Sequence, residues 1–237
     1  DTTPEGEQVN IYGNHVGSWN FAATAYLNRW KVKIYYEHYF DDHSQMFFQY
    51  GRWKDGHIGL EITFPKNRFI DTFVYEGLGT KDQTGPMLYD SFWGEFEEQI
   101  SAKDNYYNHY LYQGWQHWGM GIGNPLLPGP IYNKNGQITF ISNRVLAHHI
   151  GFCGSPCQSL SYRMLLSYSR HWGTYDNPLN EIKKQFNSLF EVTYAPQQLK
   201  GWSFTVSGAM DRGSILGNNY GGMLVIRKQG IIKSGNK

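Results

Sequence analysis

The sequence has few charged residues and no long apolar segment. Asp, Glu, Lys and Arg make up 17% of the 237 residues and the formal net charge is +1, which suggests neither a nucleic acid nor an acidic partner. Apolar runs extend over only a few residues, which excludes a transmembrane helix. Because the chain opens on a polar segment without an initiator Met or signal peptide, we expect it to be part of a longer protein.

Cysteine is also scarce. Cys153 and Cys157 are the only two, and both lie in the segment CGSPC. We expect a small turn there, and a disulfide between them stays open for an oxidising compartment. A metal site would need two further ligands, which the segment does not supply. The sequence therefore predicts no metal site and no cofactor.

Alternation of apolar and polar residues is abundant. In RWKVKIYYEHYF (29–40), Trp30 and Ile34 fall on one side of an extended chain, and Lys31 and Lys33 fall on the other. This period of two is typical of β-strands with one apolar and one polar face. The same pattern recurs in residues 17–28, 57–64, 159–170 and 201–211.

Short and long connections follow one another between these segments, as in an up-and-down antiparallel meander. The expected strands are 15–27, 30–40, 57–64, 69–77, 91–100, 106–116, 138–152, 159–171, 188–195, 201–211 and 219–228, with one more at 8–13. The expected short turns are 28–29, 65–68, 101–105, 153–157 and 196–201. The expected long loops are 41–56, 78–90, 117–136, 172–187 and 212–218.

These features predict a membrane protein. Strands of about 9–11 residues, short turns at one end and long loops at the other are typical of an outer-membrane β-barrel, whose apolar face meets lipid. Trp19, Trp30, Tyr168 and Trp202 stand at strand ends, where aromatic girdles lie. The predicted fold is one all-β domain (1–237), an up-and-down antiparallel transmembrane β-barrel of about 11–12 strands, incomplete at its N-terminus and part of a larger barrel. The alternative is a soluble sheet half covered by another element, which alternation alone does not reject.

Residues 104–133 combine aromatic rings with amide and imidazole groups. Ring faces suit the C–H face of a sugar, and the polar groups suit its hydroxyls. We therefore expect a polysaccharide-binding site there, and the alternative is an aromatic collar with a Gly/Pro loop folded into the barrel mouth. The candidate binding residues of this segment are Tyr107, His109, Trp115, His117 and Trp118.

Arg144 is a further candidate binding residue, in the segment NRVLAHH (143–149). Its guanidinium could bind an acidic polysaccharide, or it could pair with Glu61, Glu95 or Glu97 across the barrel interior. Both possibilities require this side chain to point inward.

Trp172 and Tyr175 complete the candidate site, from the expected outer loop that contains HWGTYDNP (171–178). The segment DDHSQ (41–45) suits a solvated turn better than a cation site. No nucleophile elbow, P-loop or zinc-protease motif occurs, and adjacent carboxylates such as Glu97 and Glu98 point to opposite faces of a strand. The sequence therefore predicts no catalytic residue and no enzyme.

Five blocks carry a resemblance to a known family: NHVGSWNF, EHYFDDHSQMF, DNYYNH, GWQHWGMGIGNPLL and SRHWGTYDNP. The chain resembles the Wzi-type capsule assembly proteins, in particular the branch of anaerobic gut-type bacteria, over about residues 10–228. The resemblance implies an outer-membrane β-barrel with lectin-like affinity for surface polysaccharide. It also implies a larger barrel with an N-terminal portion that this chain lacks.

The resulting expectation is a non-catalytic barrel in the outer membrane of a Gram-negative bacterium that binds capsular or other surface polysaccharide and helps to attach or organise the capsule. Its expected partners are that polysaccharide and outer-membrane lipid, with no nucleic acid; protein partners are not predicted. Two alternatives remain open: a porin-like channel for small solutes or oligosaccharides, and an outer-membrane hydrolase or acyltransferase that uses a His with a carboxylate.

Overall fold

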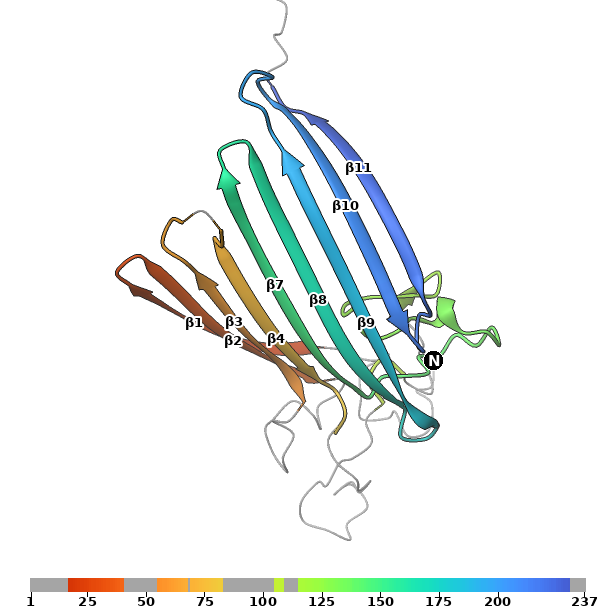
Figure 1. Ribbon diagram of the computed structural model, residues 1–237. Helices are drawn as coiled ribbons and strands as arrows, with labels where there is room; N and C mark the ends of the chain where they lie inside the picture. Colours follow the sequence, from red (N-terminus) through yellow and green to blue (C-terminus); the bar gives the residue numbers. More distant parts are fainter. Residues whose placement is uncertain (1–16, 41–54, 68, 83–104, 109–114, 231–237) are drawn as a thin grey trace, which may run out of the picture.

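The computed structural model describes residues 17–40, 55–67, 69–82, 105–108 and 115–230. These residues form an all-β fold whose main element is one nine-stranded antiparallel sheet (Figure 1). Each strand of this sheet pairs with the next strand of the same sheet along the chain, which confirms the predicted all-β fold of antiparallel neighbours. Thr72–Gly79 pairs directly with Val145–Cys157, whereas the prediction placed the strands 91–100 and 106–116 between them. The strands of the sheet are β1 (Gly17–Leu27), β2 (Trp30–Phe40), β3 (Gly56–Thr63), β4 (Thr72–Gly79), β7 (Val145–Cys157), β8 (Leu160–Gly173), β9 (Pro178–Tyr194), β10 (Trp202–Gly213) and β11 (Asn219–Lys228).

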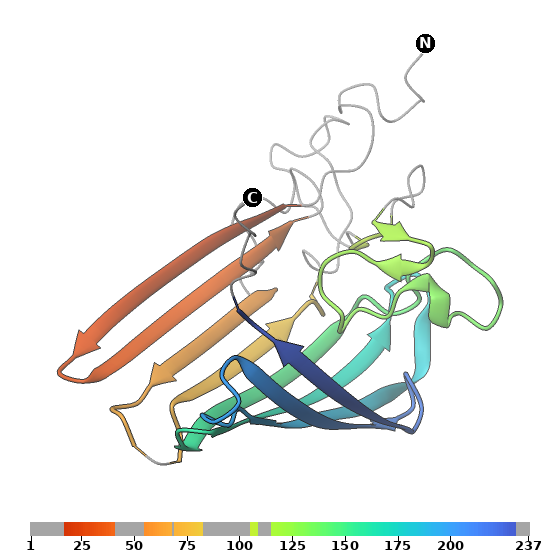
Figure 2. The same ribbon diagram turned by 90° about the horizontal axis from the view of Figure 1, so that it is seen from above.

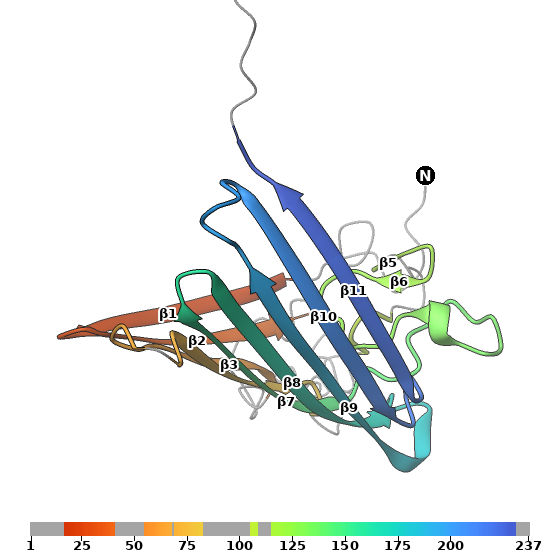
Figure 3. The same cartoon turned by 45° about the horizontal axis from the view of Figure 1, so that its top comes forward.

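The two ends of the sheet differ in the links between strands. At one end, called the turn end, the links are 28–29, 64–71, 158–159 and 195–201. The opposite end is called the connection end, because it carries the long β4–β7 connection beside the short turns 174–177 and 214–218; residues 80–82, 105–108 and 115–144 of that connection are described. This connection contains the small hairpin β5 (Gln116–His117) and β6 (Met120–Gly121) and the 3-10 helix η4 (Pro130–Tyr132), all gathered beside the connection end of the sheet (Figures 1 and 3).

The sheet is curved across its width (Figure 2) but open in the part of the chain described. β1 and β11 form its edges, and each is paired on one side only among the described residues. The described residues therefore form an open antiparallel sheet and no closed barrel. The expected strands 8–13 and 91–100 lie outside the described residues.

Several strand boundaries differ from the sequence prediction. β9 begins at Pro178 rather than 188, so the expected long loop 172–187 is wrong and the turn covers only 174–177. The expected loop 212–218 is likewise a short turn, 214–218. The polar stretch at the start of β9 hid the strand, because Lys183 and Gln185 lie on a polar face, opposite His171 and Ser169 of β8.

The segment CGSPC is not a turn. β7 continues to Cys157, with a β-bulge between Gly154 and Cys157, and the turn follows at 158–159. At its other end β7 begins at Val145 rather than 138, because Asn133 donates two side-chain hydrogen bonds, to the carbonyls of Gln137 (2.7 Å) and Thr139 (2.8 Å), and holds that segment in a loop.

The expected strand 106–116 is also wrong where it is described. Residues 105–108 form a turn, and only the two-residue strand β5 begins at Gln116. Tyr107 adopts a left-handed backbone conformation with φ 65°, which ends any strand at that point.

The register sorts the strand residues onto two faces, as predicted. The apolar face contains Trp30, Val32, Ile34 and Tyr36 of β2 and the residues paired with them, and it is exposed: Ile34 is 54% exposed and Val206 is 61% exposed. The polar face contains Lys31, Lys33, Glu37 and their partners. Several of its polar side chains are buried, as at Gln185 (2% exposed) and Ser207 (6%).

The small hydrophobic core lies at the connection end of the polar face. Leu78, Val145 and Ala147 project from β4 and β7, and Leu127 of the β4–β7 connection packs on them. Buried polar contacts join the same parts. Thr80 Oγ1 donates to the carbonyl of Asn143 (2.7 Å) and accepts the N–H of Val145 (3.0 Å). The connection is therefore packed on the polar face rather than on the apolar one.

Candidate functional site

Seven of the eight predicted binding residues are described, and they separate into two groups at the connection end of the sheet. Tyr107, Trp115, His117 and Trp118 belong to the β4–β7 connection, and Arg144, Trp172 and Tyr175 surround the ends of β7 and β8. His109 lies outside the described residues.

Trp118 is the most exposed of these side chains because it occupies the turn of the β5–β6 hairpin. Its φ is 54°, that of Gly119 is 79°, and the side chain of Gln116 accepts the Gly119 N–H (2.6 Å). The indole is 86% exposed, and the His117 ring meets it edge-on at 6.1 Å between ring centroids. The carbonyl of Gly119 accepts the N–H of Ile131 (2.8 Å), so the hairpin is anchored to the rest of the connection. The result is a fixed turn that presents one aromatic face to solvent.

Tyr107 and Trp115 have supporting positions instead. The Tyr107 ring stacks on Phe140 with 5.1 Å between centroids and packs against the hydrophobic core. Asn108 strengthens this pairing through two hydrogen bonds with the main chain of Phe140 (2.7 and 2.8 Å). Trp115 is half-buried, and its carbonyl accepts the N–H of Ile122 (3.0 Å). This part of the segment is thus packed on the connection end of the sheet.

Arg144 and Tyr175 hold the segment that follows β4. The guanidinium of Arg144 lies 3.9 Å from the centroid of the Tyr175 ring, and its Nε donates to the carbonyl of Lys81 (3.1 Å). The Tyr175 hydroxyl donates to the carbonyl of Asp82 (3.1 Å). Burial raises the pKa of Tyr175 above its ordinary value, and the nearby Arg144 acts in the opposite direction.

Of the possible carboxylate partners of Arg144, Glu61 is not bonded to it. Glu61 binds Lys31 on the polar face (3.4 Å), whereas Arg144 precedes β7 beside Trp172 and points to the Tyr175 ring. The other proposed partners, Glu95 and Glu97, lie outside the described residues.

Trp172 lies between two cations. Lys81 Nζ is 5.2 Å from the centroid of its ring, and the guanidinium carbon of Arg170 is 5.3 Å away, which are distances for cation–π contact. Trp172 follows Tyr168 and Arg170 of the apolar-face series of β8, at an irregularity in the β8–β9 pairing between His171 and Gly173. Its contact with Arg170 places the ring beside that series.

Sequence reasoning missed a series of polar contacts across the polar face. His57 lies between two carboxylates, 3.9 Å from Glu37 and 3.6 Å from Glu76, and the Tyr35 hydroxyl donates to Glu76. Only the register reveals these contacts, because the residues are far apart in the chain. Similar pairs continue across the later strands: His149–Ser167 (2.7 Å), Arg163–Glu191 (3.3 Å), Asn187–Asp211 (2.7 Å) and Thr193–Thr205 (2.8 Å).

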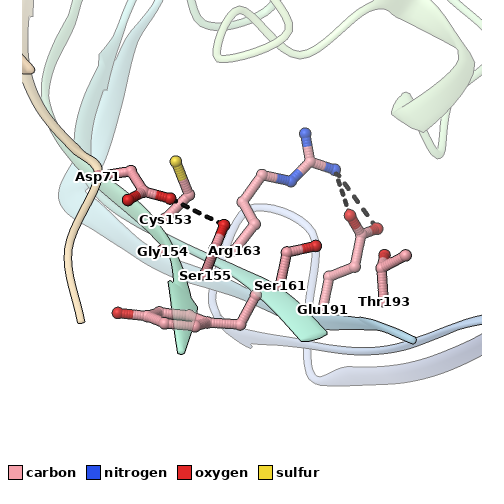
Figure 4. Close-up of a pocket in the computed structure, with 9 residues that line it drawn as sticks. Asp71, Cys153, Gly154, Ser155, Ser161, Arg163, Glu191 and Thr193 are labelled. Atoms are coloured by element: carbon pink, nitrogen blue, oxygen red, sulfur yellow. Dashed lines mark hydrogen bonds and ion pairs between the residues drawn. The ribbon is translucent and has the colours of Figure 1, made fainter. Parts of the chain in front are cut away.

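A hollow of about 240 Å³ opens near the turn end of the polar face (Figure 4). Ser155 donates to Asp71 across one side of it (2.9 Å), and Arg163 reaches Glu191 on the other. Cys153 also lines this hollow, and both Cys153 and Cys157 are free thiols. The lining offers charges and hydroxyls to a polar solute.

A buried Ser–His contact bears on the enzyme alternative. His171 Nε2 lies 2.9 Å from Ser169 Oγ, and His171 Nδ1 lies 3.4 Å from Ser142 Oγ. All three side chains are buried, so a substrate would not reach them, and in the described residues no carboxylate bonds to this imidazole. The pair lacks the accessible nucleophile and the orienting acid that a Ser–His mechanism needs.

The described residues include no group of three His, Cys, Asp or Glu side chains placed to hold a metal ion. None of the helical segments in that part of the chain is long and apolar enough to cross a membrane.

Comparison with known proteins gives no match to a family model or to a curated protein.

Removal of the Arg144 side chain tests the clamp between β7, Tyr175 and residues 81–82. We expect Arg144→Ala to lower the free energy of unfolding by about 1.5–3 kcal/mol, because it removes a charged hydrogen bond and a cation–π contact. A urea titration followed by tryptophan fluorescence measures this loss. Arg29→Ala, at an exposed position in the turn 28–29, is the control and should change the stability by less than about 0.5 kcal/mol. Equal stabilities of the two variants would contradict the clamp.

Proposed function

We propose that the protein is an outer-membrane β-barrel protein of a Gram-negative bacterium, with its apolar face toward lipid. The observation that carries this proposal is the inversion of the sheet: apolar side chains are exposed on one face, while polar ones are buried or paired on the other. A soluble protein buries its apolar face, whereas a membrane barrel turns it outward. An exposed apolar face across nine strands far exceeds the apolar patches of typical soluble monomers.

Aromatic side chains gather toward the two ends of the apolar face and support the proposal, while Tyr75 and Phe190 lie between them. Tyr194 at the turn end and Phe186 at the connection end of β9 are eight residues apart. At about 3.3 Å per residue and a tilt of about 40°, this separation spans about 20 Å, close to the height of about 25 Å of the apolar band in such barrels. The turn-end row comprises Trp30, Phe73, Phe152, Tyr162, Tyr194, Trp202 and Phe204, and the connection-end row comprises Trp19, Tyr36, Phe40, Tyr168, Trp172, Phe186 and Tyr220.

The open edges at β1 and β11 require further strands for a closed barrel. The proposal therefore includes a barrel larger than the nine strands of the sheet. In its orientation the turn end faces the periplasm and the connection end faces the outside, because short turns are periplasmic in such barrels.

A mobility experiment tests membrane insertion. Expressed in cells as the longer protein with a signal peptide, of which we expect this chain to be a part, the barrel should fractionate with the outer membrane and migrate differently on SDS gels before and after heating, because closed barrels resist the detergent. A soluble protein with the same mobility before and after heating would mean that the apolar face is covered by protein rather than by lipid.

Within this class, we infer a non-catalytic role in binding surface polysaccharide and in attaching or organising the capsule. Trp118 offers an exposed ring at the outer end of the proposed barrel, and His117 lies beside it with a polar imidazole. A sugar C–H face can stack on such a ring while neighbouring polar groups bind its hydroxyls. The resemblance of five sequence blocks to the Wzi-type capsule assembly proteins supports the same role.

Replacement of Trp118 tests the sugar site. We expect Trp118→Ala to weaken retention of capsular polysaccharide from the source cells by about three- to tenfold, because the stacking surface is lost. Trp118→Phe should retain part of the affinity. Tyr26→Ala removes another highly exposed ring, at the turn end, and serves as the control. Unchanged retention with Trp118→Ala, in a protein that still shows the heat-dependent mobility, would refute this site.

The polar face also favours a second candidate function, a porin-like channel. Charged pairs such as Lys31–Glu61 and Arg163–Glu191 would line its lumen. This function predicts stepwise conductance in planar bilayers, whereas the binding function predicts little conductance because the β4–β7 connection covers part of the polar face.

A further inference from the structure

The apolar face changes character in steps toward the connection end. Along the β8–β9 pairing, Leu166 lies opposite Ser188, then Tyr168 opposite Phe186, and finally Arg170 opposite Lys184. Aliphatic, aromatic and basic residues therefore succeed one another along the same face. This order follows the layers of a bilayer, in which aromatic rings lie at the interface and cations lie at the headgroups.

Four cations lie at this last level or beside it. Lys81 and Arg170 both contact the Trp172 ring, and Lys184 is opposite Arg170. Arg212 of β10 is opposite Phe186, at the edge of the aromatic level. We call Lys81, Arg170, Lys184 and Arg212 the basic band. Lys184 and Arg212 are exposed, so their charged groups are available to a ligand.

The basic band differs from the cations of the polar face. Lys31 and Arg163 are bonded there to Glu61 and Glu191. In the described part of the chain, by contrast, no carboxylate forms an ion pair with a member of the basic band. The nearby acids Asp176 and Glu181 are exposed and bonded to none of the four. The band therefore leaves its positive charge for an external anion.

We propose that the basic band binds the phosphate groups of a lipid headgroup in the leaflet that surrounds the connection end. This inference rests on the proposed membrane insertion and adds a lipid site to it. Arg170 and Arg212 supply forked donors that match phosphate oxygens, and Lys184 and Lys81 supply point charges on long apolar stems. A headgroup fits better than an acidic polysaccharide, because the band continues the apolar face on which lipid chains would lie, whereas Trp118 belongs to the connection on the other face.

Binding of lipid A to the full chain in detergent micelles tests the proposal, with native mass spectrometry as the readout. Lipid A should bind, and lipid A stripped of its phosphates should bind at least about tenfold more weakly, the change expected for loss of one charged hydrogen bond. The double variant Arg170→Gln/Lys184→Gln should weaken the binding of lipid A by at least as much. The matched control, Lys134→Gln/Lys200→Gln, also removes two exposed charges and should bind normally.

Each other outcome overturns the proposal. Equal binding of both lipids, or full binding by the double variant, would exclude phosphate recognition by the band. If the double variant keeps lipid A but loses capsular polysaccharide, the cations serve the polysaccharide instead. Heat-dependent gel mobility of every variant, made in the same longer protein, separates these results from a failure of membrane insertion. A folded barrel that binds both lipids equally refutes only the lipid site. Absence of the mobility shift in the unmodified longer protein refutes both.

Discussion

The alternation of side chains along extended strands is the constraint on which the rest of the structure depends. Because the period is two, one register fixes the face of every strand residue at once. Leu27 opposite Trp30 and Ala23 opposite Ile34 place the apolar residues of β1 and β2 together, and the same phase continues across the sheet to β11. A slip of one residue in β2 would bring Lys31, Lys33 and Glu37 onto the apolar face. The long ladders therefore specify the two faces together with the fold.

This separation gathers polar side chains on one face, where they form hydrogen bonds and ion pairs with residues of neighbouring strands. His57 between Glu37 and Glu76, Arg163 with Glu191, and Asn187 with Asp211 give polar side chains partners on neighbouring strands. At the connection end the polar side chains bond to the β4–β7 connection instead, because this connection covers that part of the polar face. There Asp55 is buried, and its carboxylate accepts the Tyr106 hydroxyl (3.1 Å) and the N–H of Asp82 (2.9 Å). Buried polar groups thus fasten the connection to the sheet while hydrogen bonds compensate their burial.

The strands and their faces were predictable from the sequence to the extent that alternation was visible. β1, β2, β10 and β11 alternate clearly and lie within a few residues of their predicted bounds. The prediction failed where tertiary contacts override the local pattern. The alternating aromatic residues of 106–116 resemble a strand, yet Tyr107 stacks on Phe140, more than thirty residues away, and leaves the extended conformation. Gly and Pro in CGSPC indicated a turn, but the bulge accommodates them within β7.

In the candidate site, too, local features were predictable from the sequence and tertiary contacts were not. The exposure of Trp118 follows from a local glycine turn, which the sequence could suggest. The partners of Arg144 could not be inferred, because Lys81 and Tyr175 come close only once β4, β7 and β8 are side by side. Charge alone suggested a carboxylate partner for this arginine, whereas the structure satisfies it with a carbonyl and a ring.

The placement of the β4–β7 connection bears on the choice between binding and conduction. Leu127 and the stacked pair of Tyr107 and Phe140 add apolar packing where a water-filled channel would need polar walls. Opening a passage there would expose Val145, which is buried, and break the hydrogen bonds of Asn143 and Thr80. Such a rearrangement costs both apolar burial and buried hydrogen bonds. The same packing holds the hairpin that carries Trp118 in a fixed position. The anchored Trp118 ring at the connection end of the sheet therefore fits the proposed retention of a ligand better than its passage.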